Sequence, residues 1–294
     1  MADTTFVNGV TLTDADWFND VNRLHYTIFG DPANKNTARN TLLSTSLGKA
    51  IHGLTYSNNG SDATNDIDIA SGGAMDATGA YWMALSSTLT KQSDVSWAVG
   101  TNAGWLDTGA IGNNDYYIWL IARSDTGVVD SLLSLSSTAP TMPSNYDYKR
   151  LIGWIKRSGG TIVAFNTYET EGGGIELMWA APTLDVNLAA TLTTSRRTDA
   201  LKVPLNFSTI ALFNVEADDA SNTLITVCCP DQTDAAPSAT AAPLSSFISV
   251  VSQGGYANMA VRTSATGTVA SRATTATVDN YRISTHGFRW SRRN

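Results

Sequence analysis

The chain of 294 residues is poor in charged side chains and has only two cysteines and three histidines. Charged residues make up 15% of the sequence, well below the roughly 25% of an average soluble domain, and the net charge is −7. The polar surface must therefore come mostly from Thr, Ser, Asn and Gly, which favour short strands and turns over exposed helices. The negative net charge argues against nucleic acid as a partner.

The scarcity of metal-binding side chains excludes several kinds of site. Cys228 and Cys229 are adjacent, so they match neither a disulfide framework nor the spacing of a zinc site. His25, His52 and His286 are far apart, and none has a His or Cys neighbour at a ligand spacing. We therefore expect no metal, no cofactor and no need for an oxidising compartment.

Long apolar runs are also missing. No stretch approaches the roughly 20 apolar residues that cross a bilayer, which predicts no membrane insertion. The first residues, Met1 to Thr5, have neither the basic region nor the apolar region of a secretion signal. We expect a protein that is made in a cytoplasm and stays soluble.

One helix is predicted near the N-terminus, between Thr13 and Gly30. Thr13 is a good N-cap, and Gly30 followed by Asp31 and Pro32 ends the helix. Its apolar residues repeat at helical spacing and lie on one face, which consists of Trp17, Phe18, Val21, Leu24 and Ile28. A helix of this length with such a face is marginal in water, so we expect the face to dock on another surface.

The rest of the chain is predicted to form short strands separated by turns, the pattern of antiparallel sandwiches. The expected strands of the first half are 50–56, 66–70, 81–85, 95–99, 116–121, 128–135, 149–155 and 161–168. Those of the second half are 175–179, 184–192, 202–205, 210–217, 224–229, 247–251, 258–262 and 281–290. The sequence Asp125-Thr126-Gly127 predicts a hairpin turn.

These patterns predict a mainly β protein with an N-terminal helix and two antiparallel, jelly-roll-like β-sandwiches. The glycine-rich stretch from Glu171 to Gly174 is the strongest candidate for a domain boundary. The expected parts are a helical anchor and connector (1–48), a first sandwich (49–171) and a second sandwich (172–294).

Carboxylates and aromatics are the candidates for chemistry. Glycosidase chemistry needs two carboxylates facing each other across a sugar, whereas most aspartates here lie in or beside turns, where they cap their own backbone. Asp66 and Asp68 share a strand face and, with Asp62 and Asn65, could offer oxygens to Ca²⁺, but their spacing fails the EF-hand pattern. We expect no catalytic residue and no metal site.

The first half is rich in Trp and Tyr, which either fill a core or anchor an interface. Tyr117 and Trp119 alternate on one strand face and are predicted to be core residues. Trp105 follows Gly104 in an expected turn, so it is the candidate for an exposed ligand contact.

Basic residues gather at the C-terminal end. Asp279 alone opposes six arginines, namely Arg262, Arg272, Arg282, Arg289, Arg292 and Arg293. These arginines either pair with acids elsewhere in the fold or form a contact surface for an acidic neighbour or a polysaccharide.

Ordered fragments between residues 65 and 150 resemble a module of bacteriophage tail fibres and related virion proteins. The fragments are NDIDIA (65–70), LSS (85–87), LTKQ (89–92), WAVG (97–100), Gly104 with LDTG (106–109), RSDTGVVD (123–130), TAPTMP (138–143) and NYDYKR (145–150). Near the start, FVNGVTLTDADWFNDV (6–21) is similar to the segment that anchors many tail fibres and tailspikes to the particle.

The resemblance implies a virion component, usually a homotrimer, and leaves its place on the particle open. We favour a non-enzymatic protein of the phage tail. It would be a tail fibre or receptor-binding protein that contacts other virion proteins and a host surface glycan or protein. The alternatives are a tail connector, baseplate or head-decoration protein without a host ligand, and, less favoured, a polysaccharide depolymerase. The helix face defined above would dock on the virion.

Overall fold

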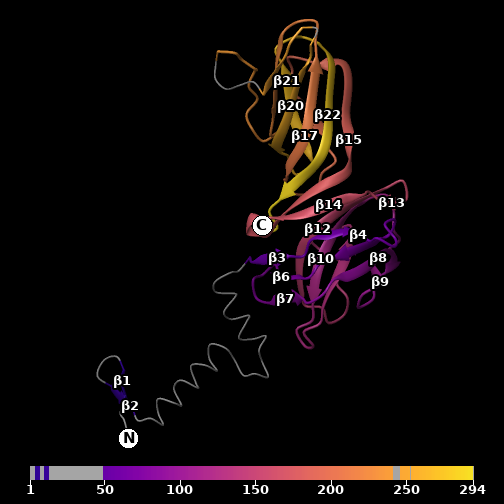
Figure 1. Ribbon diagram of the computed structural model, residues 1–294, viewed down its shortest axis with the longest axis vertical. Helices are drawn as coiled ribbons and strands as arrows, with labels where there is room; N and C mark the ends of the chain where they lie inside the picture. The colour runs from indigo at the N-terminus through magenta and orange to yellow at the C-terminus, as the bar shows by residue number, and fades with distance from the viewer. Residues whose placement is uncertain (1–3, 7–9, 13–48, 241–245, 252, 294) are drawn as a thin grey trace.

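The computed structural model describes residues 4–6, 10–12, 49–240, 246–251 and 253–293 (Figure 1). Within them the chain is mainly β, and its strands gather into several sheets. From residue 49 onward the sheets form two bodies stacked along the long axis, with the C-terminus beside their junction (Figure 1). No helix in the described part is long and apolar enough to cross a membrane. The helix predicted between Thr13 and Gly30 lies outside the described residues.

The first body combines a large sheet with a small one. Its strands are β3 (Ile51–Gly53), β4 (Tyr56–Asn58), β5 (Asp66–Ile69), β6 (Gly72–Met75), β7 (Trp82–Leu85), β8 (Leu89–Ser96), β9 (Ala103–Leu106), β10 (Asp115–Ala122), β11 (Val129–Ser134), β12 (Tyr148–Ser158) and β13 (Thr161–Ile162). The large sheet has the order β13-β12-β10-β11-β9-β8-β5-β4, and the small one β3-β6-β7. The small sheet packs on the large one through β7, which contacts β10 and β11. A separate hairpin pairs β1 (Thr4–Phe6) with β2 (Val10–Leu12).

The hairpin predicted at Asp125-Thr126-Gly127 is confirmed. It joins β10 to β11, which pair antiparallel. The backbone N–H of Arg123 donates to the carbonyl of Val128 at 3.0 Å and closes the turn. Local turn chemistry was enough to predict this feature, because both strands lie next to the turn in the sequence.

Strand β9 departs from the predicted antiparallel arrangement, because it runs parallel to both neighbours, β8 and β11. The chain leaves β8 after Ser96, turns back through residues 97–102 and begins β9 beside the middle of β8. The ammonium of Lys91 holds this return segment by donating to the carbonyls of Ala98 at 2.7 Å and Gly100 at 3.2 Å. Parallel neighbours usually need a long crossover, so the short return depends on this internal support.

Gly104→Ala is expected to lower the free energy of unfolding by about 3 kcal/mol. A Cβ at this position would lie 1.9 Å from the backbone carbonyl oxygen of Ser96, so β8 and β9 would have to move apart. Gly60→Ala is the matched control: a Cβ there meets nothing within 4 Å, and its effect should stay within about 0.5 kcal/mol. Denaturant unfolding measures both variants. Equal midpoints for the two would contradict the close approach of β8 and β9.

The large sheet curls until β4, at one edge, lies over β12, near the other. The Tyr56 hydroxyl donates to the carbonyl of Trp154 at 3.0 Å and accepts from the N–H of the same residue at 3.1 Å. Gly153 leaves the room for the ring, because a Cβ there would lie 2.5 Å from a Tyr56 ring carbon. The curl brings the two ends of the large sheet together around the buried side chains of the first body.

The second body is a sandwich of two sheets. Its strands are β14 (Phe165–Thr170), β15 (Gly174–Leu192), β16 (Arg197–Ala200), β17 (Ile210–Asp218), β18 (Thr223–Cys228), β19 (Phe247–Ser249), β20 (Gly255–Arg262), β21 (Thr268–Ala273) and β22 (Val278–Trp290). One sheet has the order β14-β15-β22-β17-β20 and the other β16-β21-β18-β19, with antiparallel neighbours. Burial alternates along β17 and β18, as a strand with one face in the core requires.

The boundary predicted after Glu171 does not separate the sheets of the two bodies. β14, which precedes it, pairs along its length with β15, which follows it. The 3-10 helix η2 (Glu171–Gly173) is the tight connection between them. Gly172 and Gly173 have φ values of 72° and 74°, a region that other residues rarely adopt. The glycines therefore serve a turn within one sheet, and the second body begins at Phe165.

The strand predicted at Lys202 to Leu205 is wrong. The chain between β16 and β17 crosses from one sheet to the other without strand structure. Leu201 and Val203 are nevertheless buried, and Pro204 has no N–H to donate to a ladder. Their spacing of two produced the strand-like pattern in an irregular segment.

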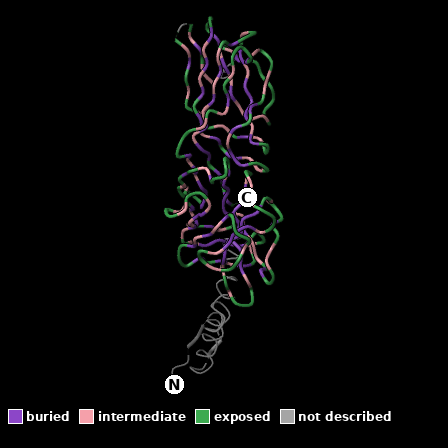
Figure 2. The backbone as a smooth tube through the Cα atoms, turned by 90° about the vertical axis from the view of Figure 1, so that its right-hand side faces the viewer, coloured by how far each residue is buried: buried purple, intermediate pink, exposed green. Residues whose placement is uncertain are grey.

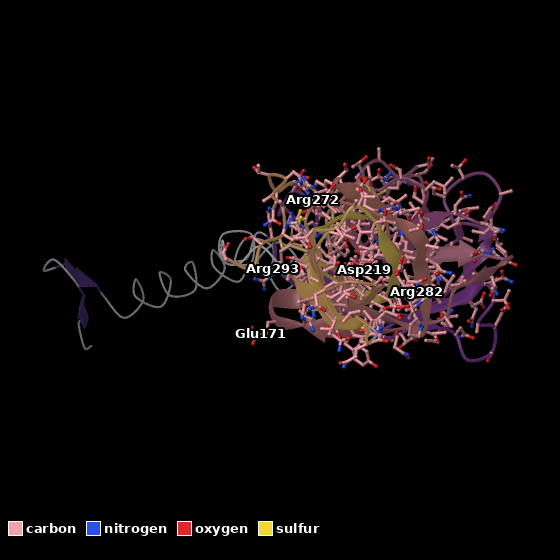
Figure 3. All side chains as sticks on the ribbon, turned by 90° about the horizontal axis from the view of Figure 1, so that it is seen from above. Glu171, Asp219, Arg272, Arg282 and Arg293 are labelled. Carbon is pink, nitrogen blue, oxygen red and sulfur yellow. The ribbon has the colours of Figure 1, made fainter. Side chains whose placement is uncertain are left out.

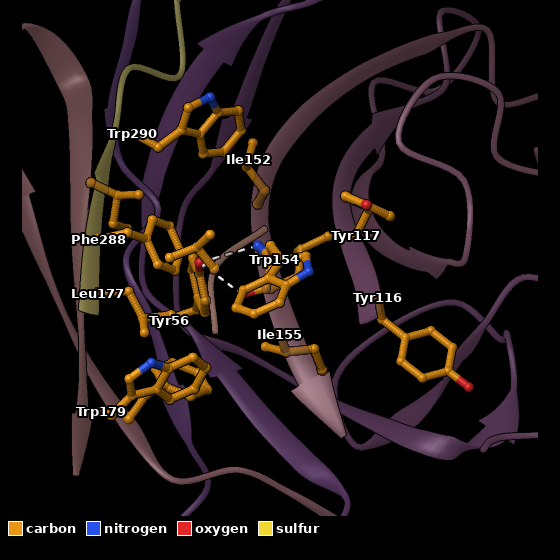
Figure 4. Packing of buried hydrophobic residues seen from close by; sticks show 14 of the residues in the cluster. Tyr56, Tyr116, Tyr117, Ile152, Trp154, Ile155, Leu177, Trp179, Phe288 and Trp290 are labelled. Carbon is orange, nitrogen blue, oxygen red and sulfur yellow. Dashed lines mark hydrogen bonds between the residues drawn. The ribbon is translucent and has the colours of Figure 1, made fainter. Parts of the chain in front are cut away.

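The buried core continues from one body into the next, as the tube coloured by burial shows (Figure 2). Trp154 of β12 lies edge-to-face against Trp179 and Phe288 of the second body, with ring centroids 5.8 and 5.6 Å apart (Figure 4). Such pairs contribute about 0.5–1.5 kcal/mol beyond the area they bury. The aromatic richness of the first half therefore serves the core and the junction.

Candidate functional site

The residues predicted to dock on a virion, Trp17, Phe18, Val21, Leu24 and Ile28, all lie outside the described residues. Among the described residues, the structure tests the other sequence-based candidates one by one.

The expected exposure of Trp105 is wrong. Its side chain is 0% exposed, and its indole N–H donates to the Ser131 hydroxyl at 2.9 Å. The physical reason is that residues 97–102 turn the chain back. Trp105 therefore lies in strand β9, in the middle of the large sheet, and not in the expected turn. A buried indole cannot contact a ligand. The prediction that Tyr117 and Trp119 are core residues is confirmed, since both are buried.

Some aspartates of the first body accept hydrogen bonds from nearby backbone N–H groups, whereas others form ion pairs. Asp62, for example, accepts from the N–H groups of Thr64 and Asn65 at 2.9 and 3.2 Å. Asp66 is buried, and desolvation together with nearby acids, Asp62 first, raises its pKa. In the described part of the chain, no three His, Cys, Asp or Glu side chains gather where they could hold a metal ion.

Four of the six C-terminal arginines have acidic partners within 4.0 Å. The pairs are Arg272 with Asp234, Arg282 with Glu216, Arg289 with Glu176 and Arg292 with Glu169. Seen from above, Arg272 and Arg282 lie on either side of Asp219 (Figure 3). The interpretation that these arginines pair with acids elsewhere in the fold is therefore confirmed for these four residues.

The outer face of the five-stranded sheet carries a different kind of surface. Because its strands are in register, Asn187, Arg282, Glu216 and Tyr256 form one row from β15 across β22 and β17 to β20. The next row follows the same order of strands and consists of Leu184, Ser284, Asn214 and Asn258. Their side chains point away from the core, since the alternate residues of β17 are buried.

The residues of these two rows other than Asn187 line an open groove of about 400 Å³. That volume lies within the roughly 300–1,000 Å³ of small-molecule sites. Tyr256 stands at one end and is 71% exposed, the most open of the large apolar and aromatic side chains among the described residues. Leu184 is half-exposed at the other end, so apolar surface flanks a polar floor.

The charges on the groove floor are paired. The guanidinium of Arg282 donates to Glu216 Oε1 at 3.1 Å and to the Asn187 amide oxygen at 3.2 Å. Both charged side chains are about one-third exposed, so the pair adds little stability and serves mainly to fix the two groups in place. Glu216 lines the groove, so its carboxylate is a hydrogen-bond acceptor there.

A second cavity, of about 250 Å³, lies under the loop after β18. Arg196 uses its guanidinium to hold that loop, donating to the carbonyls of Cys229, Pro230 and Gln232 at 3.1, 3.0 and 2.8 Å. Burial raises the pKa of the Cys228 thiol beside it, which keeps the thiol protonated and weakly reactive. This cavity therefore supports the loop, and the groove is the better candidate for binding.

No family model, curated protein or solved structure matches this chain. Sequence reasoning missed the groove because its residues come from four strands that are far apart in the chain. The available signal was the alternation Tyr256-Ala257-Asn258, with polar and aromatic side chains on every second residue. Which other residues join them depends on the pairing of strands.

Proposed function

We propose that this chain is a non-enzymatic structural protein of a bacteriophage virion, a tail fibre or receptor-binding protein attached by its N-terminal segment. The ordered run of tail-fibre-like fragments between residues 65 and 150 carries the proposal. The anchor-like segment at 6–21 supports it, because it precedes the module in the chain as an attachment segment would.

The position of the fragments in the fold adds support. Lys91 of the LTKQ fragment pairs with Asp130 of the RSDTGVVD fragment. Their charged atoms lie 3.1 Å apart, and both side chains are buried. Asp130 also accepts from the N–H of Gly100 at 2.6 Å, and the Trp97 indole donates to the Ser131 carbonyl at 2.9 Å. Fragments that are separate in sequence thus depend on one another, which favours a folded module over chance likeness.

The second body supports an outward-facing role. From β15 onward its consecutive strands alternate between the sheets β14-β15-β22-β17-β20 and β16-β21-β18-β19, apart from the step from β18 to β19. We assign this order to the jelly-roll type, an architecture used by viral capsid and lectin domains. In the proposed arrangement the first body joins the particle through the N-terminal segment, copies associate as a homotrimer, and the second body faces the host.

The double variant Trp17→Ala with Leu24→Ala tests the attachment. We expect purified protein with unchanged circular dichroism and melting temperature, and particles that have lost the protein, because the apolar face no longer docks. Electrophoresis of purified particles measures occupancy, and Asn19→Ala, which lies outside that face, is the control. Normal occupancy of the double variant would refute attachment through this face. Labelled protein located on the head would favour the decoration alternative.

A further inference from the structure

We propose that the groove between Tyr256 and Leu184 binds an uncharged saccharide of a cell surface. The inference rests on the proposed function, since it names the ligand class of a receptor-binding face. It is built from three features of the groove: an exposed aromatic ring, a set of groups that both donate and accept hydrogen bonds, and a charge that is already balanced.

Tyr256 provides the stacking surface. It lies on β20, the edge strand of the sheet, and follows two glycines. The ring passes close to Gly254, where a Cβ would lie 3.5 Å from the Tyr256 hydroxyl. A ring that fills no core and is 71% exposed offers flat apolar surface to solvent. Sugar rings present C–H groups on one side and can cover such a face.

The floor of the groove suits hydroxyl groups. Asn214 and Asn258 are exposed neighbours in register, and each amide has both donors and an acceptor. Ser284 adds a hydroxyl beside Asn214. Sugar hydroxyls likewise donate and accept, so a pair of adjacent hydroxyls can bridge an amide and the carboxylate of Glu216. The ion pair with Arg282 fixes that carboxylate before any ligand arrives.

The balance of charge selects an uncharged ligand. Arg282 and Glu216 are the charged residues among those that line the groove, and they neutralise each other. An acidic sugar would have to compete with Glu216 for Arg282, and a cationic ligand would have to displace Arg282. Because the two charges neutralise each other, the groove offers a charged ligand no unpaired counter-charge.

The other occupant to consider is a second copy of this chain, because β20 is a sheet edge. The groove residues argue for the saccharide, since edge pairing between copies would use the backbone of β20 and would not need the polar rows on β17 and β22. The oligomeric state of a Tyr256 variant separates the two occupants.

The test uses the purified full chain on an array of neutral oligosaccharides of glucose, galactose, mannose and N-acetylglucosamine, together with matched sialylated and uronic-acid oligosaccharides. We expect binding to at least one neutral oligosaccharide, followed by about a tenfold loss of affinity in Tyr256→Ala and in Glu216→Gln, measured by calorimetry. Tyr168→Ala and Glu176→Gln are matched controls, because they remove an exposed tyrosine and an arginine-paired glutamate elsewhere on the same sheet. The controls should change affinity by less than about twofold.

Three results would overturn the inference: no neutral ligand, binding confined to acidic oligosaccharides, or equal losses in the control variants. A change of oligomeric state in Tyr256→Ala, measured by light scattering, would assign the face to a second copy instead. Particle occupancy in the Trp17 and Leu24 experiment is independent of this test. A chain that is found in virions but binds no neutral saccharide would refute the ligand assignment alone.

Discussion

Asp130→Ala is expected to lower the free energy of unfolding by about 3–5 kcal/mol, because it leaves the buried ammonium of Lys91 without its counter-charge. The two side chains are 0% and 1% exposed, and their charged atoms lie 3.1 Å apart. Urea unfolding followed by tryptophan fluorescence measures the loss. Trp97 is a natural reporter, since the Lys91 ammonium lies 5.6 Å from its ring centroid.

Asp125→Ala is the matched control for this prediction. Asp125 lies in the hairpin that precedes the same strand and pairs with Arg123 at 2.6 Å, but it is exposed. Removal of this exposed pair should change the unfolding midpoint much less than removal of the buried one, because solvent screens exposed charges. A similar loss in both variants would show that burial of the Lys91 pair contributes little.

A double variant separates the attraction between the two charges from the hydrogen bonds that the same side chains make to the backbone. If Lys91 and Asp130 stabilised only each other, Lys91→Met with Asp130→Ala would recover most of the lost stability. We expect little recovery, because the two side chains also hold backbone groups of the return segment. Lys91 donates to the carbonyl of Ala98, and Asp130 accepts from the N–H of Gly100. These groups would remain buried without partners.

The loss in Asp130→Ala should also depend on pH. Burial lowers the pKa of Lys91 in the folded chain, so the unfolded chain binds more protons between the folded pKa and 10.5. Stability therefore rises with pH through that window, and removal of Asp130 widens the window downward. We expect Asp130→Ala to regain stability relative to the parent chain as the pH rises through this window toward 10.5. A constant difference across this range would contradict the account.

Above about pH 10 the ionisation of a tyrosine lowers the stability of both chains alike, so it leaves the difference between them unchanged. Burial raises the pKa of Tyr56 to about 12 in the folded chain, from an ordinary value of 10.0. The unfolded chain loses this proton first, so stability falls as the pH rises from 10 toward 12.

Arg292→Ala is expected to destabilise the chain by about 3–5 kcal/mol and to loosen the junction between the two bodies. The guanidinium is almost fully buried and donates to three carbonyls, those of Gly173 at 2.7 Å, Leu54 at 3.0 Å and Gly53 at 2.9 Å. Leu54 has a φ of 55°, a strained value for a leucine, and this contact holds it in place. Without Arg292 all three carbonyls lose a partner at once.

Thermal unfolding by calorimetry and limited proteolysis near residues 53–54 measure the effect. Arg293→Ala is the control, because its side chain is exposed and should change stability by less than about 0.5 kcal/mol. Arg292→Lys should recover less than half of the loss, since an ammonium cannot reproduce the planar fork that reaches three carbonyls. Full recovery by Lys would show that charge alone matters at this position.

Arg292 also shows where sequence reasoning stops. As a member of a basic C-terminal group, it was expected either to pair with an acid or to form a contact surface. The structure buries it at the junction and uses it mainly for backbone carbonyls, while Glu169 lies 3.9 Å away. Nothing in the local sequence distinguishes it from Arg293, because its partners lie more than 100 residues earlier in the chain.

The sequence by itself determined the mainly β class, most of the strands and the turn at Asp125-Thr126-Gly127. These features depend on side-chain alternation and turn chemistry within a few residues. Only the tertiary structure decided that β9 runs parallel to its neighbours, that Trp105 is buried and that Tyr256 shares a groove with Arg282. Each of these depends on the pairing of distant strands, and that pairing is set by packing of the whole core.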